Sequence, residues 1–253
     1  VILDEWEDPE IPRQEFYNQR LGLAWANLDD ALTRGQVDSC LTQEAEETKC
    51  DGPTAAGVDV GKLFLYVHII KRMSPTLLKV IRRIKIKTFE ELHDISKAYN
   101  VLCGVIDAGA ETRAVSEFTL SHAGWLGCLY NEAHKGSAYW DDGNRIISVN
   151  RTITLDASHR LVLRRGVELP RKGAEKDHEL YVAQMTNLVR VSERDPKTGE
   201  PKSRWQPKSV KNDDWRHSFN YAVIAAERVP IWRKRKKRIQ DEEEESSGSF
   251  MGA

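Results

Sequence analysis

The stretch AAGVDVGKLFLYVHII, from Ala55 to Ile70, decides how the rest of this 253-residue chain is interpreted. Gly57, Gly61 and Lys62 resemble a phosphate-binding loop at first sight. Such a loop needs four residues between its glycines, a hydroxyl after the lysine and a helix that opens at the anion. Here three residues separate the glycines, leucine follows the lysine, and an apolar strand pattern comes next. The stretch therefore predicts two buried strands, with one carboxylate, Asp59, in the first, and excludes an ATPase loop at this position.

A third strand and two crossover units follow this pair. Residues 77–89 end in alternating isoleucine and lysine, which is typical of a half-exposed strand. Thr88 begins a T-x-x-E capping box, so a helix starts there and leads to the apolar strand 101–109. Another helix, 111–124, and another strand, 125–133, come next. The order βββ-α-β-α-β predicts an α/β fold whose mixed sheet joins a three-strand antiparallel meander to parallel strands, with helices on both faces.

The C-terminal half is predicted with shorter elements. Residues 139–145 suggest a turn, and 149–170 a helix followed by a short extended segment. Residues 179–207 are interpreted as two β segments joined by the turn 195–199, an added hairpin that is either a DNA-facing flap or a sheet edge. The segment 213–229 has the spacing of an amphipathic helix.

Composition divides the chain into three parts. Residues 1–52 are polar and are predicted to be an arm or linker, 53–232 the folded domain, and 233–253 a charged tail without a core of its own. The four cysteines form no C-x-x-C pair, so free thiols are expected. No apolar run approaches the roughly 20 residues that span a bilayer, and the N-terminus is acidic where a signal peptide would be basic. We therefore expect an intracellular protein with no membrane partner.

Four carboxylates are the strongest candidates for chemistry. Asp59 lies inside a buried strand, where a lone charge costs several kcal/mol unless a cation compensates it. In this topology the strand that ends at Asp107 lies beside the first strand, and the helix that begins at Asp213 and Asp214 packs across the same sheet. His217 shares a helical face with Asp213 at i, i+4. Such a cluster predicts a site for two Mg²⁺ or Mn²⁺ ions that hydrolyses a phosphodiester.

Four segments carry a resemblance to a known family. They are EFYNQRLGLAW (15–25), GVDVG (57–61), GVIDAGAET (104–112) and DDWRHSFNYAVIA (213–225), and residues 149–170 are similar as well. Together they resemble the C-terminal nuclease domain of large terminase subunits from tailed bacteriophages, which has a ribonuclease H-like fold.

The resemblance implies a metal-dependent endonuclease that cuts concatemeric, double-stranded viral DNA during genome packaging in the cytoplasm of the infected host. It also implies an ATPase domain N-terminal to this one, a portal and a small terminase subunit as partners. Asp59 and Asp107 match the first two acidic positions. At the third acidic position, either Asp213 or Asp214 is the metal ligand, and His217 stands where the family often has a carboxylate.

Binding of DNA requires cations around the acidic cluster. The candidates are Arg145, Arg151, Arg164, Arg165, Arg171 and Lys172, with Lys202, Arg204, Lys208 and Lys211 around the hairpin. Three alternatives remain open at this point: a junction resolvase or transposase-like nuclease of the same fold, a sugar-kinase or actin-like nucleotide-binding half, and a DNA-binding or docking module with a degenerate metal site. The second of these needs a duplicated domain and a second phosphate loop, neither of which is present in the sequence.

Overall fold

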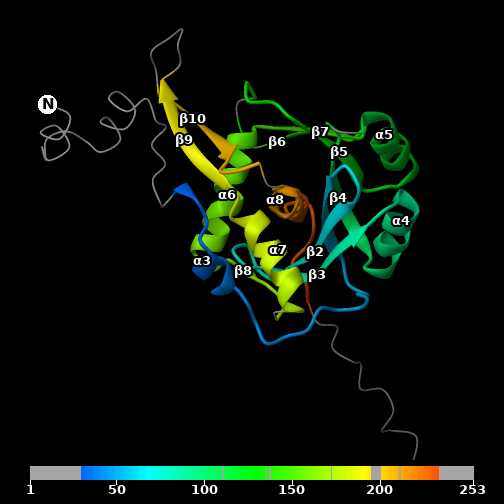
Figure 1. The fold of residues 1–253 in the computed structure, drawn as a ribbon. Helices are drawn as coiled ribbons and strands as arrows, with labels where there is room; N and C mark the ends of the chain where they lie inside the picture. Colours follow the sequence, from blue (N-terminus) through cyan, green and yellow to red (C-terminus); the bar gives the residue numbers. More distant parts are fainter. Residues whose placement is uncertain are drawn as a thin grey trace, which may run out of the picture.

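An eight-stranded mixed sheet forms the centre of the molecule (Figure 1). The computed structural model describes residues 30–109, 111–134, 136, 138–171, 173–194, 201–210 and 212–233. The strand order is β6-β7-β5-β4-β1-β2-β3-β8. The strands are β1 (Thr54–Val60), β2 (Leu65–Arg72), β3 (Leu78–Ile86), β4 (Val101–Asp107), β5 (Trp125–Tyr130), β6 (Ala138–Asp141), β7 (Ile146–Val149) and β8 (Val167–Glu168). A separate hairpin pairs β9 (Leu188–Arg194) with β10 (Pro201–Pro207).

The first three strands form the predicted antiparallel meander, and β4 pairs with β1 in parallel. Parallel pairing continues from β4 to β5 and from β5 to β7. The helices are α3 (Arg34–Asp38), α4 (Phe89–Ala98), α5 (Thr112–Ser121), α6 (Arg151–Leu163), α7 (Glu175–Met185) and α8 (Asp214–Ala226). Figure 1 shows α4 and α5 on one side of the sheet and α6, α7 and α8 on the other. The predicted fold class, a mixed sheet with helices on both faces and an added hairpin, is confirmed.

Strand β1 supplies both hydrophobic cores because its side chains alternate between the two faces of the sheet. Ala56, Val58 and Val60 pack into the core beneath α4 and α5, while Ala55 belongs to the core beneath α8. All seven residues of β1 are buried. Asp59 has the parity of Ala55, so it lies on the face that α8 covers.

Gly57 lets the backbone of α8 rest directly on β1. A Cβ atom at this position would lie 2.0 Å from the amide nitrogen of Ala222 and 2.2 Å from the carbonyl oxygen of Ser218. Both are backbone atoms of the helix, so no side-chain rotation could relieve the overlap. The absence of a side chain at Gly57 therefore sets how closely α8 approaches β1.

One predicted element is wrong. Residues 179–185, interpreted as the start of a β segment, belong to α7. The buried residues His178, Tyr181, Val182 and Met185 follow the helical spacing i, i+3, i+4, i+7, which is missed when the segment is taken to begin at Glu179. The predicted turn at 139–145 is also too wide, since β6 and β7 leave only residues 142–145 between them.

All four cysteines are free and buried, as predicted. No helix among the described residues is both long and apolar enough to cross a membrane. Residues 32–40 contribute Leu32, Val37 and Cys40 to the core beneath α8. The domain boundaries stay predictions, and most of the arm, the hairpin turn 195–200 and the tail from 234 lie outside the described residues.

Candidate active site

Asp59 and Asp107 lie side by side at the ends of two adjacent parallel strands. Val58 of β1 pairs with Ile106 of β4, and each aspartate is the next residue in its strand. The side chains of Val105 and Ala55 belong to the core beneath α8, so both aspartates share the face that this helix covers. The neighbouring positions expected from the topology are therefore confirmed.

The N-terminus of α8 brings two more carboxylates to the same place. Asp213 is the N-cap residue and Asp214 the first residue of the helix. Both raise the pKa of Asp59 through their negative charge, as Asp107 does. The four carboxylates thus form one electrostatic cluster, contributed by two strands and one helix.

Asp59 is the least compensated member of this cluster. Its side chain is 8% exposed, and no hydrogen bond or ion pair reaches it within the part of the chain that the structure describes. Burial raises the pKa of Asp59 well above its usual value, and the three neighbouring carboxylates raise it further. A buried, crowded carboxylate without a donor is the environment that a cation stabilises.

Asp213 is held by a histidine. The Nε2 atom of His217 lies 3.4 Å from the Asp213 carboxylate, and its Nδ1 atom lies 2.9 Å from the Tyr130 hydroxyl. Burial acts to raise the pKa of Asp213, but the hydrogen bond from His217, with Arg151 nearby, outweighs it and lowers the pKa. Both ring nitrogens of His217 therefore have protein partners, and the ring is placed to orient Asp213; that His217 is itself a metal ligand stays a prediction.

A chain of buried hydrogen bonds continues behind this histidine. The Asn220 amide donates to the Tyr130 oxygen at 3.3 Å, so the tyrosine hydroxyl can donate to Nδ1 and leave the proton of His217 on Nε2, facing Asp213. Asn220 accepts from the Ser158 hydroxyl at 2.7 Å, and Ser158 accepts from Arg216 at 2.9 Å.

Arg216 anchors the far end of this chain. It is 1% exposed and also donates to the Leu155 carbonyl at 3.1 Å. Burial lowers the pKa of Arg216 to about 10, so the guanidinium stays protonated at neutral pH. Because each link in the chain is buried and bonded, the rotamer of His217 is fixed by the core of the protein.

Asp214 is held by neutral partners. It accepts from Asn212 at 3.0 Å and from Gln184 at 3.4 Å, and the Tyr66 hydroxyl also bonds to it. Burial nevertheless raises its pKa. Tyr66 stands opposite Asp59 in the β1–β2 pair, so one side chain of β2 links the strand site to the helix.

The donor set suits a hard divalent cation, because Mg²⁺ and Mn²⁺ prefer carboxylate oxygens. Even so, no group of three or more His, Cys, Asp or Glu side chains among the described residues is close enough to form a ready-made metal site. Asp213 and Asp214 are instead engaged by their protein partners. The residues fit the ions in chemistry and burial, and coordination requires the side chains to close around them.

The predicted cations are distributed unevenly around this site. Arg151, at the start of α6, lies nearest: it donates to the Trp205 carbonyl at 2.7 Å, sits above the Tyr130 ring and acts on the charge of Asp213. Arg164 and Arg165 lie at the other end of this 13-residue helix, about 20 Å away. The structure does not bring those two to the cluster.

The remaining predicted cations lie on loops and the hairpin. Arg145 is half-buried in the turn after β6, with a φ of 57°. Lys202 and Arg204 of β10, Lys208 after it and Arg171 are exposed. Lys172 and Lys211 lie outside the described residues. Trp205 attaches the hairpin to α6 through a 2.9 Å hydrogen bond to Asp156.

Sequence reasoning missed the residues that support the carboxylates. Tyr130 could have been predicted to lie near the site, because it ends the parallel strand next to the one that carries Asp107. The carboxyl ends of parallel strands converge at one edge of a sheet. Arg216 and Asn220 gave no signal, since polar residues within an amphipathic helix are ordinarily assigned to the solvent face. His68 lies outside the cluster: it is fully buried and bonded to Ser218 and Tyr181.

Comparisons with known proteins find structural similarity only. No family model and no curated protein sequence matches the chain. The structure is similar to the large terminase nuclease of the thermophilic phage G20c, with 12% identity over 75% of this chain and 95% of that one and a TM-score of 0.49. It is also similar to the large terminase of a second thermophilic bacteriophage, with 11% identity over 86% of this chain and 53% of that one and a TM-score of 0.46. Another crystal form of that second protein gives 10% identity and a TM-score of 0.43, over 79% of this chain and 45% of that one.

Proposed function

We propose that this domain is a metal-dependent DNA endonuclease that hydrolyses phosphodiester bonds at the aspartate cluster. One observation carries the proposal: Asp59 is buried among Asp107, Asp213 and Asp214, without a donor of its own among the described residues, and its pKa is raised by burial and by those three charges. A structural carboxylate at this depth would have a hydrogen bond or an ion pair. A carboxylate that binds cations would not need one.

In the proposed mechanism, Asp59 and Asp107 form the fixed half of the site because they belong to paired strands. Asp213 and Asp214 form the adjustable half, since each can turn away from its present partners. Two Mg²⁺ or Mn²⁺ ions bound there would activate water and neutralise the charge on the leaving oxygen. The protein supplies the oxygen ligands, keeps His217 aimed at Asp213 through Tyr130, and shields Asp59 from bulk water.

The sequence resemblance supports a place for this activity in phage genome packaging. In that proposal the substrate is concatemeric double-stranded viral DNA, and the nuclease acts with an ATPase domain, a portal and a small terminase subunit in the host cytoplasm. The four resembling segments include both strand aspartates and the start of α8, so the resemblance and the cluster concern the same residues.

Cleavage of a supercoiled plasmid tests the proposal. The full chain would be assayed with Mg²⁺, Mn²⁺ or EDTA beside Asp59→Asn and Asp107→Asn, with Asp94→Asn, an exposed carboxylate on α4, as the matched control. We expect metal-dependent nicking that both site variants lose and the control keeps. Folded protein that cuts with neither metal would favour a DNA-binding or docking module with a degenerate site.

A further inference from the structure

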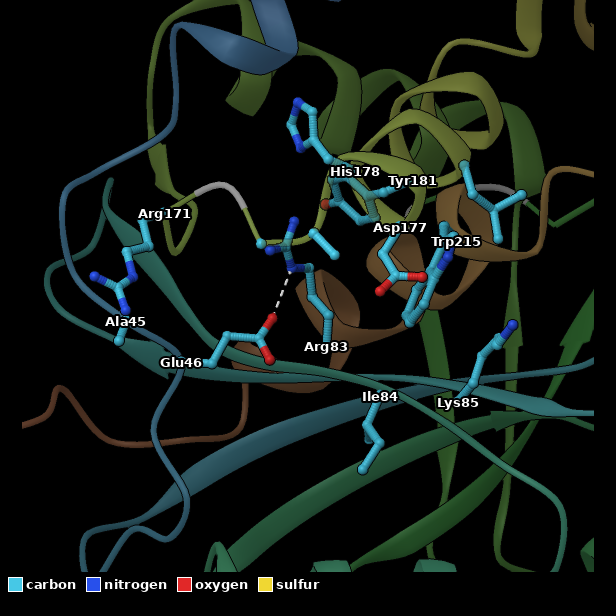
Figure 2. Close-up of a pocket in the computed structure, with 13 residues that line it drawn as sticks. Ala45, Glu46, Arg83, Ile84, Lys85, Arg171, Asp177, His178, Tyr181 and Trp215 are labelled. Atoms are coloured by element: carbon cyan, nitrogen blue, oxygen red, sulfur yellow. Dashed lines mark hydrogen bonds and ion pairs between the residues drawn. The ribbon is translucent and has the colours of Figure 1, made fainter.

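A cavity outside the aspartate cluster opens between β3, α7 and the segment before β1 (Figure 2). Its volume is about 400 Å³. Three cationic side chains line it: Arg83 and Lys85 from β3 and Arg171 from the loop before α7. In Figure 2, Arg83 occupies the middle of the cavity, with Arg171 on one side and Lys85 on the other.

Arg83 is held in place before any ligand arrives. Its Nε atom donates to Glu46 at 3.0 Å, its guanidinium lies 4.6 Å from the centre of the Tyr181 ring, and its side chain is only 10% exposed. Glu46 also accepts from Arg82, so this carboxylate is already shared between two guanidinium groups. A preorganised arginine of this kind suits recognition of a phosphate.

The rest of the lining is consistent with an anionic ligand. Helix α7 begins beside the cavity at its N-cap residue Ala174, whose methyl side chain cannot cap the first amides. Asp177, in the first turn, opposes an anion, and Glu46 is the other carboxylate of the lining. With Glu46 neutralised by Arg82 and Arg83, the two exposed cations Lys85 and Arg171 outweigh Asp177.

The cavity adjoins the aspartate cluster through one aromatic contact. Trp215 lines the cavity and follows Asp214 directly in α8. Its ring packs edge-on against Tyr66, with 5.0 Å between the ring centres, and the Tyr66 hydroxyl bonds to Asp214. A polyanion whose backbone crosses the cluster would therefore pass close to Trp215 and the cavity.

We propose that this cavity binds a backbone phosphate of the DNA strand that extends from the scissile bond, through Arg83, Lys85 and Arg171. The inference rests on the proposed function, because it takes the substrate to be DNA. It gives the cluster, which repels phosphate in the absence of metal, a cationic anchor on the β3 side that complements Arg151 on the α6 side. The recognition is of phosphate and carries no sequence preference.

Salt dependence of DNA binding tests the anchor. The full chain carrying Asp59→Asn would be titrated in EDTA onto a short fluorescein-labelled duplex across a NaCl series, so that binding is measured without cleavage. The test variant adds Lys85→Gln and Arg171→Gln, and Arg83 is kept because it also binds Glu46. The control adds Lys97→Gln and Arg113→Gln, two exposed cations of α4 and α5 on the opposite side of the sheet.

We expect the test variant to reduce the slope of log K against log[NaCl] by about 2, because each lost phosphate contact removes roughly 0.9. The control should keep the parental slope. Equal slopes in both variants would overturn the anchor. The duplex would also be challenged with inorganic phosphate or a deoxynucleoside monophosphate. If these displace the duplex from the parent but not from the test variant, and the two proteins have the same salt slope, the anchor is overturned and the cavity is a small-molecule site.

The two proposals fail separately. If the test variant has a reduced salt slope but the protein with Asp59 intact never cuts plasmid, the phosphate anchor is supported and the nuclease is rejected. If the protein with Asp59 intact cuts plasmid in a metal-dependent way but the test variant has the same salt slope as the control, the nuclease is supported and the anchor is rejected.

Discussion

Replacing Asp59 by asparagine separates the requirements of folding from those of function at this site. The substitution keeps the shape of the side chain and removes a negative charge that is 8% exposed, repelled by three carboxylates and bonded to nothing among the described residues. Removal of an uncompensated buried charge is stabilising, and single substitutions usually change stability by about 0.5–3 kcal/mol. We therefore expect the metal-free variant to be more stable than the parent by about 1–2 kcal/mol, or roughly 2–8 °C in Tm for a domain of this size.

Metal should reverse the order of stability. At a free Mn²⁺ concentration about 100 times its Kd, binding would stabilise the parent by about 2.7 kcal/mol, while the variant, which lacks a central ligand, would gain little. Urea unfolding in EDTA and in MnCl₂ measures both effects on the same proteins. The parent should be the less stable protein in EDTA and the more stable one in Mn²⁺.

Asp156→Asn is the matched control, because Asp156 is a carboxylate with partners. It accepts from the Trp205 indole at 2.9 Å and lies 3.1 Å from the Arg190 guanidinium. Loss of these charged bonds should destabilise that variant by about 1–2 kcal/mol with or without metal. If Asp59→Asn destabilised the metal-free protein in the same way, Asp59 would be a satisfied structural residue and the reasoning for a metal site would be refuted.

Three further changes probe how the site is built. Gly57→Ala should lower the free energy of unfolding by more than the ~1–3 kcal/mol usual for overpacking, because the new Cβ atom would overlap the backbone at Ala222. Urea unfolding measures this loss, and a loss below about 1 kcal/mol would show that α8 can shift freely. Tyr130→Phe removes the hydroxyl that donates to His217 Nδ1, so it should weaken Mn²⁺ binding about 10–100-fold, measured by calorimetry, with little change in Tm. Unchanged Mn²⁺ binding would show that Tyr130 does not orient His217. Burial, with Arg83 nearby, holds the pKa of His68 well below its usual value, so the unfolded chain takes up that proton first. The stability that His68 contributes is therefore complete above about pH 6.5 and falls as the pH drops, and His68→Gln should flatten the decline in unfolding free energy between about pH 7.5 and 5.5.

The sequence was sufficient for strands β1 to β5, because each of these β segments has a local signal, whereas β6 and β7 were not predicted and flank residues that were interpreted as a turn. The apolar run around Asp59, the isoleucine–lysine alternation in β3 and the capping box at Thr88 each specify one element, and the order of elements then restricts the topology. Helix α7 was misread because its apolar residues are compatible with a strand when the pattern is started one residue late. Only the contact of His178 and Tyr181 with the core establishes the helical spacing.

The site was predictable to the extent that topology alone brings residues together. Asp59 and Asp107 meet because β1 and β4 are adjacent parallel strands, which follows from the order of elements. The chain from Tyr130 through Asn220 to Arg216 could not be predicted, because it depends on which faces of α6 and α8 meet. A buried arginine and an exposed one look the same in a sequence.

Both helix carboxylates of the cluster, Asp213 and Asp214, are held by protein partners. Asp213 is bound to His217, and Asp214 to Asn212, Gln184 and Tyr66. If the proposed cations bind at the cluster, Asp213 and Asp214 would have to exchange these protein hydrogen bonds for metal bonds.

Asp59 has no such bonds to exchange. It is the one carboxylate of the four with neither a hydrogen bond nor an ion pair within the described residues, so binding a cation there carries only a gain. If the cluster binds the proposed cations, the free energy of binding should therefore originate mainly at Asp59, while the partners of Asp213 and Asp214 would determine which of those two turns towards the metal. The stability that Asp59 costs the protein without metal would then be recovered as affinity for the cation.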